Sequence, residues 1–172
     1  MTGGKFKFKP KIVYITKFIN TEIPMTETYQ APFHYSLTVK NIEETAAFYR
    51  DIFQCTSGRS GPNWLDINLY GHMVSFHEDP DFQIHAFYNE VESLKVPIPH
   101  FGLCLNMEQY QNLYDRIKRR EDIDWIFKDK ERFSGTHGGQ RDLFLRDPSG
   151  NAIEIKGMLN GLDDLFTVAD TQ

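Results

Sequence analysis

Two widely separated stretches of the chain alternate between apolar and polar residues, and this period of two predicts β-strands. The first stretch covers residues 32–39 and the second covers residues 99–105. In each stretch one face is apolar, and the other carries small or polar residues that follow a histidine, His34 or His100. Two strands of the same design predict that the chain contains one structural unit twice.

Each predicted strand is followed by apolar residues at helical spacing, which predicts helices over residues 41–53 and 106–120. Each unit then ends in a hairpin, one turning at Tyr70-Gly71 and the other through the Asp-Pro-Ser-Gly sequence at 147–150. Proline followed by Ser-Gly strongly favours a turn. Both units, at residues 31–79 and 99–158, therefore consist of a strand, a helix and two or three further strands.

The remaining segments are interpreted from their composition. Residues 80–98, which carry two prolines, are predicted to be a linker, and residues 159–172 a C-terminal tail. Residues 1–30 form an N-terminal extension. Its alternating lysine and phenylalanine residues suit an edge strand, and a leader before a natural start at Met25 is the alternative. A longer connection over residues 122–139 ends in a glycine-rich run and is a candidate lid.

The polar faces of the predicted strands carry His34, His77, His100 and Glu154. Histidine and glutamate side chains that face one another in a buried space are costly unless they are paired or ligated. Imidazole nitrogens with one carboxylate recur as sites for Fe(II), Mn, Zn, Ni or Co. A single histidine in a strand is more often a hydrogen-bonded structural residue. Two histidines at matching places in two repeats, with a glutamate on the last strand, favour a metal site instead.

Composition narrows the possible partners. The 172 residues carry a net charge of -5, which argues against nucleic acid and gives no reason to expect a membrane surface. Hydrophobic residues make up 40% of the chain, enough for a core. No apolar run is long enough to span a membrane, and Cys55 and Cys104 match no metal or redox spacing. A cytoplasmic protein with two reduced thiols is expected.

The same residues resemble those of the vicinal oxygen chelate superfamily, which includes glyoxalase I, bleomycin-resistance proteins and type I extradiol dioxygenases. The resemblance covers residues 31–158. Within the superfamily, the chain most resembles the small, single-domain proteins described as predicted extradiol-type dioxygenases. This resemblance implies an α+β fold in which two tandem βαβββ modules form an open mixed-sheet cup with helices outside. The motifs that carry it are His34-x-x-Leu37-x-Val39, Ala47-Phe48-Tyr49, His100-x-x-Leu103 and the run from Asp147 to Glu154.

The resemblance implies roles for particular residues. His34, His100 and Glu154 match the family's metal ligands, and His77 lies on the strand that holds an acid-base histidine, although it could be a fourth ligand. One divalent ion is expected, with Fe(II) or Mn(II) favoured and Zn, Ni or Co possible. The implied activity is an extradiol-type dioxygenase that uses O2 to cleave a small vicinal diol-like substrate.

Two positions depart from the family pattern. Ser75 stands where glyoxalase I-like members place a catalytic glutamate, and Phe144 stands where ring-cleaving enzymes usually carry a tyrosine hydroxyl. The alternatives are therefore a glyoxalase-like isomerase or lyase, or a resistance-type protein that binds a small molecule. A homodimer is expected from the resemblance. Asp66 and Asp142 share the parity of residues that line the cup, and the predicted substrate contacts are Ser75, His137, Phe144 and Asn68.

Overall fold

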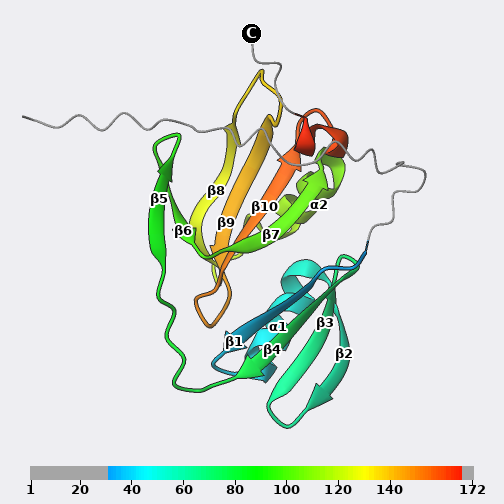
Figure 1. The fold of residues 1–172 in the computed structure, drawn as a ribbon, viewed down its shortest axis with the longest axis vertical. Coiled ribbons are helices and arrows are strands. Elements are labelled where there is room, and N and C mark those ends of the chain that lie inside the picture. The colour runs from blue at the N-terminus through cyan, green and yellow to red at the C-terminus, as the bar shows by residue number, and fades with distance from the viewer. Residues whose placement is uncertain (1–30, 168–172) are drawn as a thin grey trace, which may run out of the picture. The chain divides into compact units, whose positions relative to one another are not determined.

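Two units with the same succession of elements make up most of residues 31–167, the part of the chain that the computed structural model describes (Figure 1). The predicted N-terminal extension at 1–30 and the last five residues of the predicted tail lie outside the described residues. Within the described part, no helix has the length and apolar character that a membrane crossing requires.

The first unit is a βαβββ module. Its strand order is β1-β4-β3-β2, with β1 parallel to β4 and the other pairs antiparallel. Its elements are β1 (His34–Val39), α1 (Ile42–Phe53), β2 (Thr56–Gly61), β3 (Trp64–Leu69) and β4 (His72–Glu78).

The second unit repeats this topology, with strand order β7-β10-β9-β8 and β7 parallel to β10. The predicted α+β fold with two tandem βαβββ modules and mixed sheets is therefore confirmed. Its elements are β7 (Phe101–Asn106), α2 (Met107–Ile117), β8 (Asp124–Arg132), β9 (Gln140–Arg146) and β10 (Ala152–Met158), followed by the short 3-10 helix η1 (Leu162–Phe166).

Both helices begin at an asparagine that the sequence places at the end of the first strand. The Asn41 side chain accepts a hydrogen bond from the backbone N–H of Glu44, which satisfies one of the free donors at the start of α1. Asn106 caps α2, and its side chain and that of Gln109 each bond the other's backbone N–H. Each helix packs on one face of its own sheet (Figure 1), which leaves the opposite face for polar side chains.

The apolar faces predicted from the alternation supply the core. Val39, Phe76, Ile153 and Ile155 are almost completely buried, and they belong to one cluster that includes residues of both modules. Burial at about 25 cal/mol per Å² makes this shared core the main source of stability. The two modules thus share one apolar core, and their polar side chains lie on the opposite faces of the sheets.

The Asp-Pro-Ser-Gly turn joins the second module to the first. The Asp147 carboxylate accepts hydrogen bonds from the backbone N–H groups of Ser149 and Asn151, each at 2.9 Å. The Ser149 hydroxyl accepts from the backbone N–H of Lys40 at 2.9 Å, and the Asn151 amide donates to the Thr38 carbonyl at 3.1 Å. The turn therefore binds the end of β1 as well as shaping its own hairpin.

Part of the predicted linker at 80–98 is a two-stranded hairpin, β5 (Phe87–Val91) and β6 (Leu94–Ile98). Its turn residues Glu92 and Ser93 have φ angles of 49° and 65°, the left-handed conformation that tight hairpin turns require. Neither is the glycine or asparagine that usually marks such a turn, and Pro97 lies within β6. Because of these residues, the sequence does not predict the hairpin.

The predicted longer connection at 122–139 is wrong as a continuous loop, because half of it is the nine-residue strand β8. Its pairing with β9 shifts register twice, between Trp125 and Phe127 and again between Phe127 and Lys130. Each irregularity moves side chains to the other face, so the strand shows no regular alternation in the sequence. Only residues 133–139 form the glycine-rich connection.

Candidate metal centre

His100 and Glu154 lie side by side on the polar face of the second sheet. Glu154 is in β10, opposite Gly102 of the parallel strand β7, and His100 immediately precedes β7. The His100 Nε2 and Glu154 Oε2 atoms are 3.2 Å apart. Gly102 allows the two strands to approach, since a Cβ atom there would lie 1.6 Å from the Glu154 carbonyl oxygen.

The second ring nitrogen of His100 fixes the orientation of the imidazole. Nδ1 lies 2.6 Å from the carbonyl oxygen of Pro97, at the base of the β5–β6 hairpin. A carbonyl oxygen can only accept, so Nδ1 donates its proton to it and Nε2 is left to face Glu154. The hydrogen bond with Glu154 raises the pKa of His100, because the carboxylate favours the imidazolium form.

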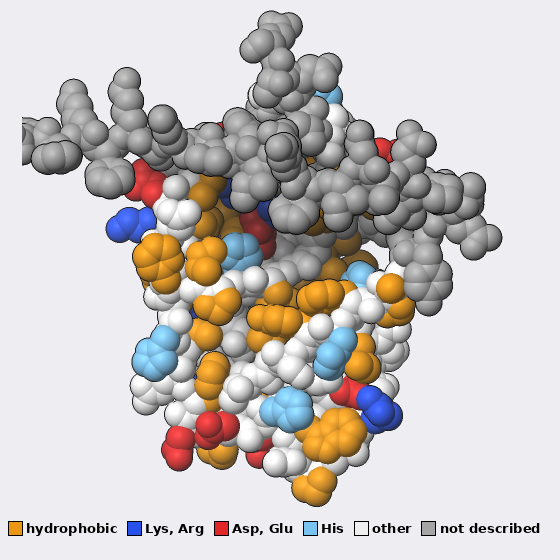
Figure 2. Space-filling view, in the orientation of Figure 1, with side chains coloured by type: hydrophobic (Ala, Val, Ile, Leu, Met, Phe, Trp, Pro, Cys, Tyr) orange, Lys and Arg blue, Asp and Glu red, His pale blue; other side chains and the backbone are white. Residues whose placement is uncertain are grey.

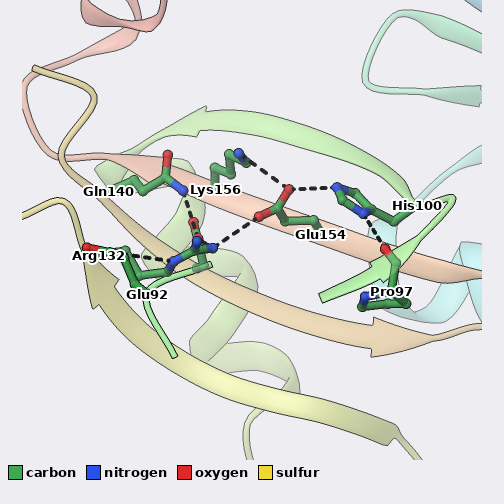
Figure 3. A network of polar contacts seen from close by, with 8 residues as sticks. Glu92, Pro97, His100, Arg132, Gln140, Glu154 and Lys156 are labelled. Atoms are coloured by element: carbon green, nitrogen blue, oxygen red, sulfur yellow. Dashed lines mark hydrogen bonds and ion pairs between the residues drawn. The ribbon is translucent and has the colours of Figure 1, made fainter. Parts of the chain in front are cut away.

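Glu154 is also surrounded by cations (Figure 3). Lys156 Nζ lies 3.4 Å from Oε2, the oxygen that faces His100, and Arg132 lies 3.7 Å from Oε1. The Glu154 side chain is only 8% exposed, so these partners neutralise a carboxylate that is largely removed from water. The arrangement keeps the Glu154 carboxylate, a candidate ligand, in place beside His100.

Arg132 extends this network to a second buried carboxylate. Its guanidinium donates to Asp142 at 2.7 Å, and Gln140 donates to the same carboxylate oxygen. The other oxygen of Asp142 is buried and has no hydrogen-bond partner among the described residues. Burial raises the pKa of Asp142, since removal from water penalises the ionised form.

The geometry of the His100–Glu154 pair fits two ligands of one metal ion. Bonds of about 2.1 Å to neighbouring octahedral positions place the two donor atoms about 3 Å apart, close to the separation observed. An unprotonated Nε2 and an ionised carboxylate oxygen are both acceptors and repel at this distance unless a proton or a cation lies between them. The pair therefore suits a divalent cation, with the Pro97 carbonyl as the group that orients the imidazole.

His34 lies on the polar face of the other sheet. It pairs with Met73 in the register of β1 and β4, and its side chain is exposed. Within residues 31–167, no group of three or more histidine, cysteine or acidic side chains could together hold a metal ion. Histidines appear as separate patches on the face that Figure 2 shows. Within one chain, the structure brings together His100 and Glu154 but not His34.

Ser75 occupies the position in the first module that Glu154 occupies in the second. Tyr35 pairs with Val74 and Phe101 pairs with Ile153, so the next residues, Ser75 and Glu154, match when the repeats are aligned. The carboxylate in the first module comes from the adjacent strand instead. The buried Asp66 accepts a hydrogen bond from the Ser75 hydroxyl at 2.5 Å.

Arg59 completes this cluster, since its guanidinium lies 3.0 Å from Asp66. The Ser75 hydrogen bond, followed by the contacts with Arg59 and the charge of His34, holds the pKa of Asp66 below its usual value. The first module thus presents an ionised carboxylate on the face that carries His34. The sequence alone indicates which face of the strand Asp66 lies on, but not that Ser75 and Arg59 contact it.

His77 lies at the far end of the same face. Thr38 is its partner in β1, four residues beyond His34, which is a separation of about 13 Å along the strand. Asn68 lies near the other end, where its side chain accepts a hydrogen bond from the Gly71 N–H at 2.7 Å. The predicted polar contacts of the first module are therefore spread along the sheet.

The other predicted substrate contacts belong to the second module. Phe144 is buried, and its ring lies 5.1 Å from both the His100 and the Phe127 rings, measured between centroids. His137 is exposed in the glycine-rich connection, and its Nδ1 lies 3.0 Å from the Asp164 carboxylate on η1. Phe144 is thus next to the candidate ligands, while His137 is tied to the 3-10 helix.

Several residues of the site were missed by reasoning from sequence. Lys156 has the same strand parity as Glu154, so its position could have been predicted. Arg132 was hidden in the presumed connection, and Pro97 in the presumed linker, where no pattern marks a carbonyl that orients a histidine. Their contacts depend on how distant segments pack.

Comparison with solved structures supports the fold. A glyoxalase/bleomycin resistance protein/dioxygenase from Alicyclobacillus acidocaldarius is 24% identical, with a TM-score of 0.64 over 80% of this chain and 97% of that chain. FosX, a fosfomycin resistance protein from Listeria monocytogenes, is 18% identical, with a TM-score of 0.58 over 78% and 97%. FosX from Mesorhizobium loti is 9% identical, with a TM-score of 0.54 over 80% and 98%.

A comparison with curated proteins gives no significant match. The family model described as "Glyoxalase/Bleomycin resistance protein/Dioxygenase superfamily" matches residues 31–155, which include nearly all of both βαβββ modules and all three predicted metal ligands. This range, the repeated topology and the His100–Glu154 pair agree with one another. The chain belongs to the glyoxalase/bleomycin resistance protein/dioxygenase superfamily.

Proposed function

We propose that this protein is a metal-dependent enzyme that binds one divalent cation through His34, His100 and Glu154. The observation that carries the proposal is the 3.2 Å separation of His100 Nε2 and Glu154 Oε2, together with the Pro97 carbonyl that occupies the other imidazole nitrogen. Two imidazoles and one carboxylate on one side of an ion leave positions open for substrate. Fe(II) or Mn(II) is favoured, and Zn, Ni or Co also accept this donor set.

The third ligand, His34, comes from a second copy of the chain in this proposal. His34 lies on a different sheet from His100 and Glu154. A symmetric dimer can therefore place His34 of one copy beside His100 and Glu154 of the other copy. Two-fold symmetry then creates two identical sites, each with ligands from both copies. The homodimer and the metal site are thus one proposal.

The reaction proposed first is extradiol-type cleavage of a small vicinal diol-like substrate, with O2 as co-substrate. When bound, the metal supplies a Lewis acid and a template for the two substrate oxygens. Phe144 packs against His100 and keeps water from that side of the site. His77 is the proton carrier predicted from the sequence, and it lies about 13 Å along the strand from His34. The ionised Asp66, which holds the Ser75 hydroxyl, is a second candidate for that role.

The Asp66–Ser75 pair favours a second candidate, a metal-dependent isomerase or lyase that needs no oxygen. An ionised carboxylate can act as a general base, and its serine partner lies where the repeat carries Glu154. A variant of FosX from Listeria monocytogenes, a protein that shares the fold, forms a complex with Mn(II) and 1S,2S-dihydroxypropylphosphonic acid. An oxygen requirement separates the two candidates.

Metal content is the first test. Protein purified without chelator should contain about one divalent ion per chain by elemental analysis, and Glu154→Ala should lose it. Glu108→Ala, which removes an exposed acid in the first turn of α2, is the matched control and should retain the metal. A wild-type chain that binds no divalent ion would instead favour a resistance-type binding protein.

The reaction is tested on anaerobic protein reconstituted with Fe(II), by measuring O2 uptake across a panel of catechols. If one of the variants Asp66→Asn and His77→Ala takes up O2 more slowly than the wild type, the substituted residue is the proton carrier. Turnover of α-hydroxycarbonyl compounds without oxygen would support the isomerase or lyase. Stoichiometric iron with no uptake on any diol would contradict the dioxygenase.

Mixing two inactive variants tests the shared site. His34→Ala and Glu154→Ala homodimers should each bind little metal. A heterodimer of the two contains one site with all three ligands intact, so subunit exchange should restore metal binding at that site. If the mixture binds no more metal than the separate variants, the metal site is not formed by His34 of one copy with His100 and Glu154 of the other.

A further inference from the structure

A cavity of about 690 Å³ lies between the β5–β6 hairpin and β8. The hairpin contributes Tyr88, Leu94 and Lys95, and the strand contributes Ile126, Phe127 and Lys130. The cavity is open to solvent on one side, and its volume is within the range of pockets that bind small organic molecules. No sequence pattern indicates the cavity, because the sequence predicts a linker at 80–98 and a connection at 122–139, where its two walls lie.

The cavity opens on the same sheet face as the candidate metal ligands. Phe127 pairs with Phe144 in β9, and Phe144 pairs with Glu154 in β10, so the three side chains form one row. Two strand spacings separate Phe127 from Glu154, which is about 10 Å. The Phe127 ring touches the Phe144 ring, and that ring touches His100.

The hairpin wall is fastened at both ends to this face. Near its tip, Glu92 lies 3.3 Å from Arg132, the same arginine that approaches Glu154. At its base, the Pro97 carbonyl accepts the hydrogen bond from His100. The cavity and the candidate metal centre therefore share their supporting residues.

The lining combines apolar surface and positive charge with the polar side chains of Asn89 and Ser93. Phe127 and Tyr88 provide aromatic faces, and Lys130 Nζ lies 5.7 Å from the centre of the Phe127 ring. Glu90 is the acid of the lining and stands opposite Lys95 in the hairpin register, so these two opposite charges are neighbours. Within residues 31–167, no carboxylate lies at ion-pair distance from Lys130. Lys130 is therefore the exposed cation of the lining that lies beside the aromatic wall.

We infer that this cavity binds the body of the substrate, and that the substrate is a flat, hydrophobic or aromatic molecule with an acidic group. The acidic group pairs with Lys130, and the ring lies against Phe127 and Leu94. The opposite end of the molecule reaches towards His100 and Glu154, about 10 Å away. This inference rests on the proposed metal enzyme for its reaction, but the cavity binds its ligand without the metal.

Two ligands of equal shape test the charge requirement in metal-free protein. 1-Naphthoate carries a carboxylate, and 1-naphthamide is its neutral counterpart. Isothermal titration should show 1-naphthoate binding about tenfold more tightly, the effect of about one partly desolvated ion pair. Equal affinity for the two compounds, or no binding of 1-naphthoate, would overturn the inference.

Lysine substitutions locate the effect. Lys130→Met keeps the apolar stem and removes the charge, so it should abolish the preference for 1-naphthoate. Lys128→Met is the matched control on the same strand, since Lys128 lies over Trp125 and outside the cavity lining. Both lysines are exposed, so both variants should fold. An equal loss in both variants would contradict the proposed pairing.

Methyl NMR spectra give an independent readout of position. On addition of 1-naphthoate, the signals of Leu94 and Ile126 should shift, while Leu69 in the first module should not. Shifts confined to other residues would place the ligand elsewhere and overturn the assignment. Metal content is measured separately, so failure of the metal proposal and failure of the cavity proposal give different results.

Discussion

The hydroxyl group of Tyr49, on α1 of the first module, donates a hydrogen bond of 3.3 Å to the carboxylate of Asp147, in the last turn of the second module. Both residues are buried, and burial together with the Asp147 charge raises the pKa of Tyr49 well above its usual value. The bond joins the Asp-Pro-Ser-Gly turn to a helix 98 positions earlier in the chain. The turn is thus part of the contact between the modules.

Replacement of Asp147 should therefore destabilise both modules together. Asp147→Ala leaves the backbone N–H groups of Ser149 and Asn151 and the Tyr49 hydroxyl without their acceptor. We expect the free energy of unfolding in urea to fall by about 2 to 4 kcal/mol, the usual cost of several unsatisfied buried donors. Asp124→Ala, which removes an exposed carboxylate near Arg146, should change it by less than about 0.5 kcal/mol. Similar losses in both variants would contradict the buried role of Asp147.

Gly102 should resist even the smallest side chain. A Cβ atom there would overlap the Glu154 carbonyl, so Gly102→Ala must push β7 and β10 apart. We expect a loss of about 3 kcal/mol in unfolding free energy, together with weaker metal binding because Glu154 moves. Gly58→Ala is the control, since its nearest neighbours would be at an ordinary 3.4 Å. Calorimetry and metal titration measure the two effects, and unchanged metal affinity in a folded Gly102→Ala variant would contradict the second.

Lys156 should weaken metal binding by its charge. Its ammonium group lies 3.4 Å from the Glu154 oxygen that faces His100, and a divalent cation at that oxygen would be repelled. Lys156→Met should therefore raise the affinity for Mn(II) by about tenfold at low salt, and added salt should reduce the difference. Lys118→Met, at the end of α2 beside Asp115, should leave the affinity unchanged. A weaker affinity in Lys156→Met would show that the lysine supports the ligand.

The Cys55 thiol should react much more slowly than an ordinary cysteine. Burial raises the pKa of Cys55 to about 12, so at about pH 8 only about one molecule in ten thousand carries the reactive thiolate. Iodoacetamide should therefore label Cys55 at least about a hundredfold more slowly in the folded protein than in urea, as peptide mass spectrometry would measure. The thiolate fraction rises about tenfold per pH unit below that pKa, so labelling should speed up accordingly. Rapid labelling of folded protein near neutral pH would contradict the raised pKa of this partly buried thiol.

Local patterns predicted the repeated framework well. The alternation around His34 and His100 indicated the first strand of each module, and Asn41 and Asn106 stand where the structure begins its helices. The hairpin turns at Tyr70-Gly71 and Asp147–Gly150 also lie where they were predicted. These features depend on interactions between residues close in sequence, and so a sequence shows them.

The parts that were not predicted depend on distant contacts. Strand β8 has two register shifts, which arise from its pairing with β9 and erase its alternation. The contact of Arg132 with Glu154 requires that strand to be recognised first. His34 shares the parity of the other ligands, but parity says nothing about which sheet a strand joins. The predicted metal set therefore remains a proposal, to be tested by the mixed dimers.

The β5–β6 hairpin falls between the two modules in the sequence and belongs to neither copy of the repeat. Its tip is tied to the second sheet by the contact of Glu92 with Arg132, and Pro97 at its base orients His100 through its carbonyl. Under the proposed function, mutation of the other tip residues would change which molecules the cavity binds, while Glu92 and Pro97 keep the candidate ligands in place. Evolutionary change in specificity, and deliberate redesign, would therefore have their freest starting point at residues 89–91 and 93–95.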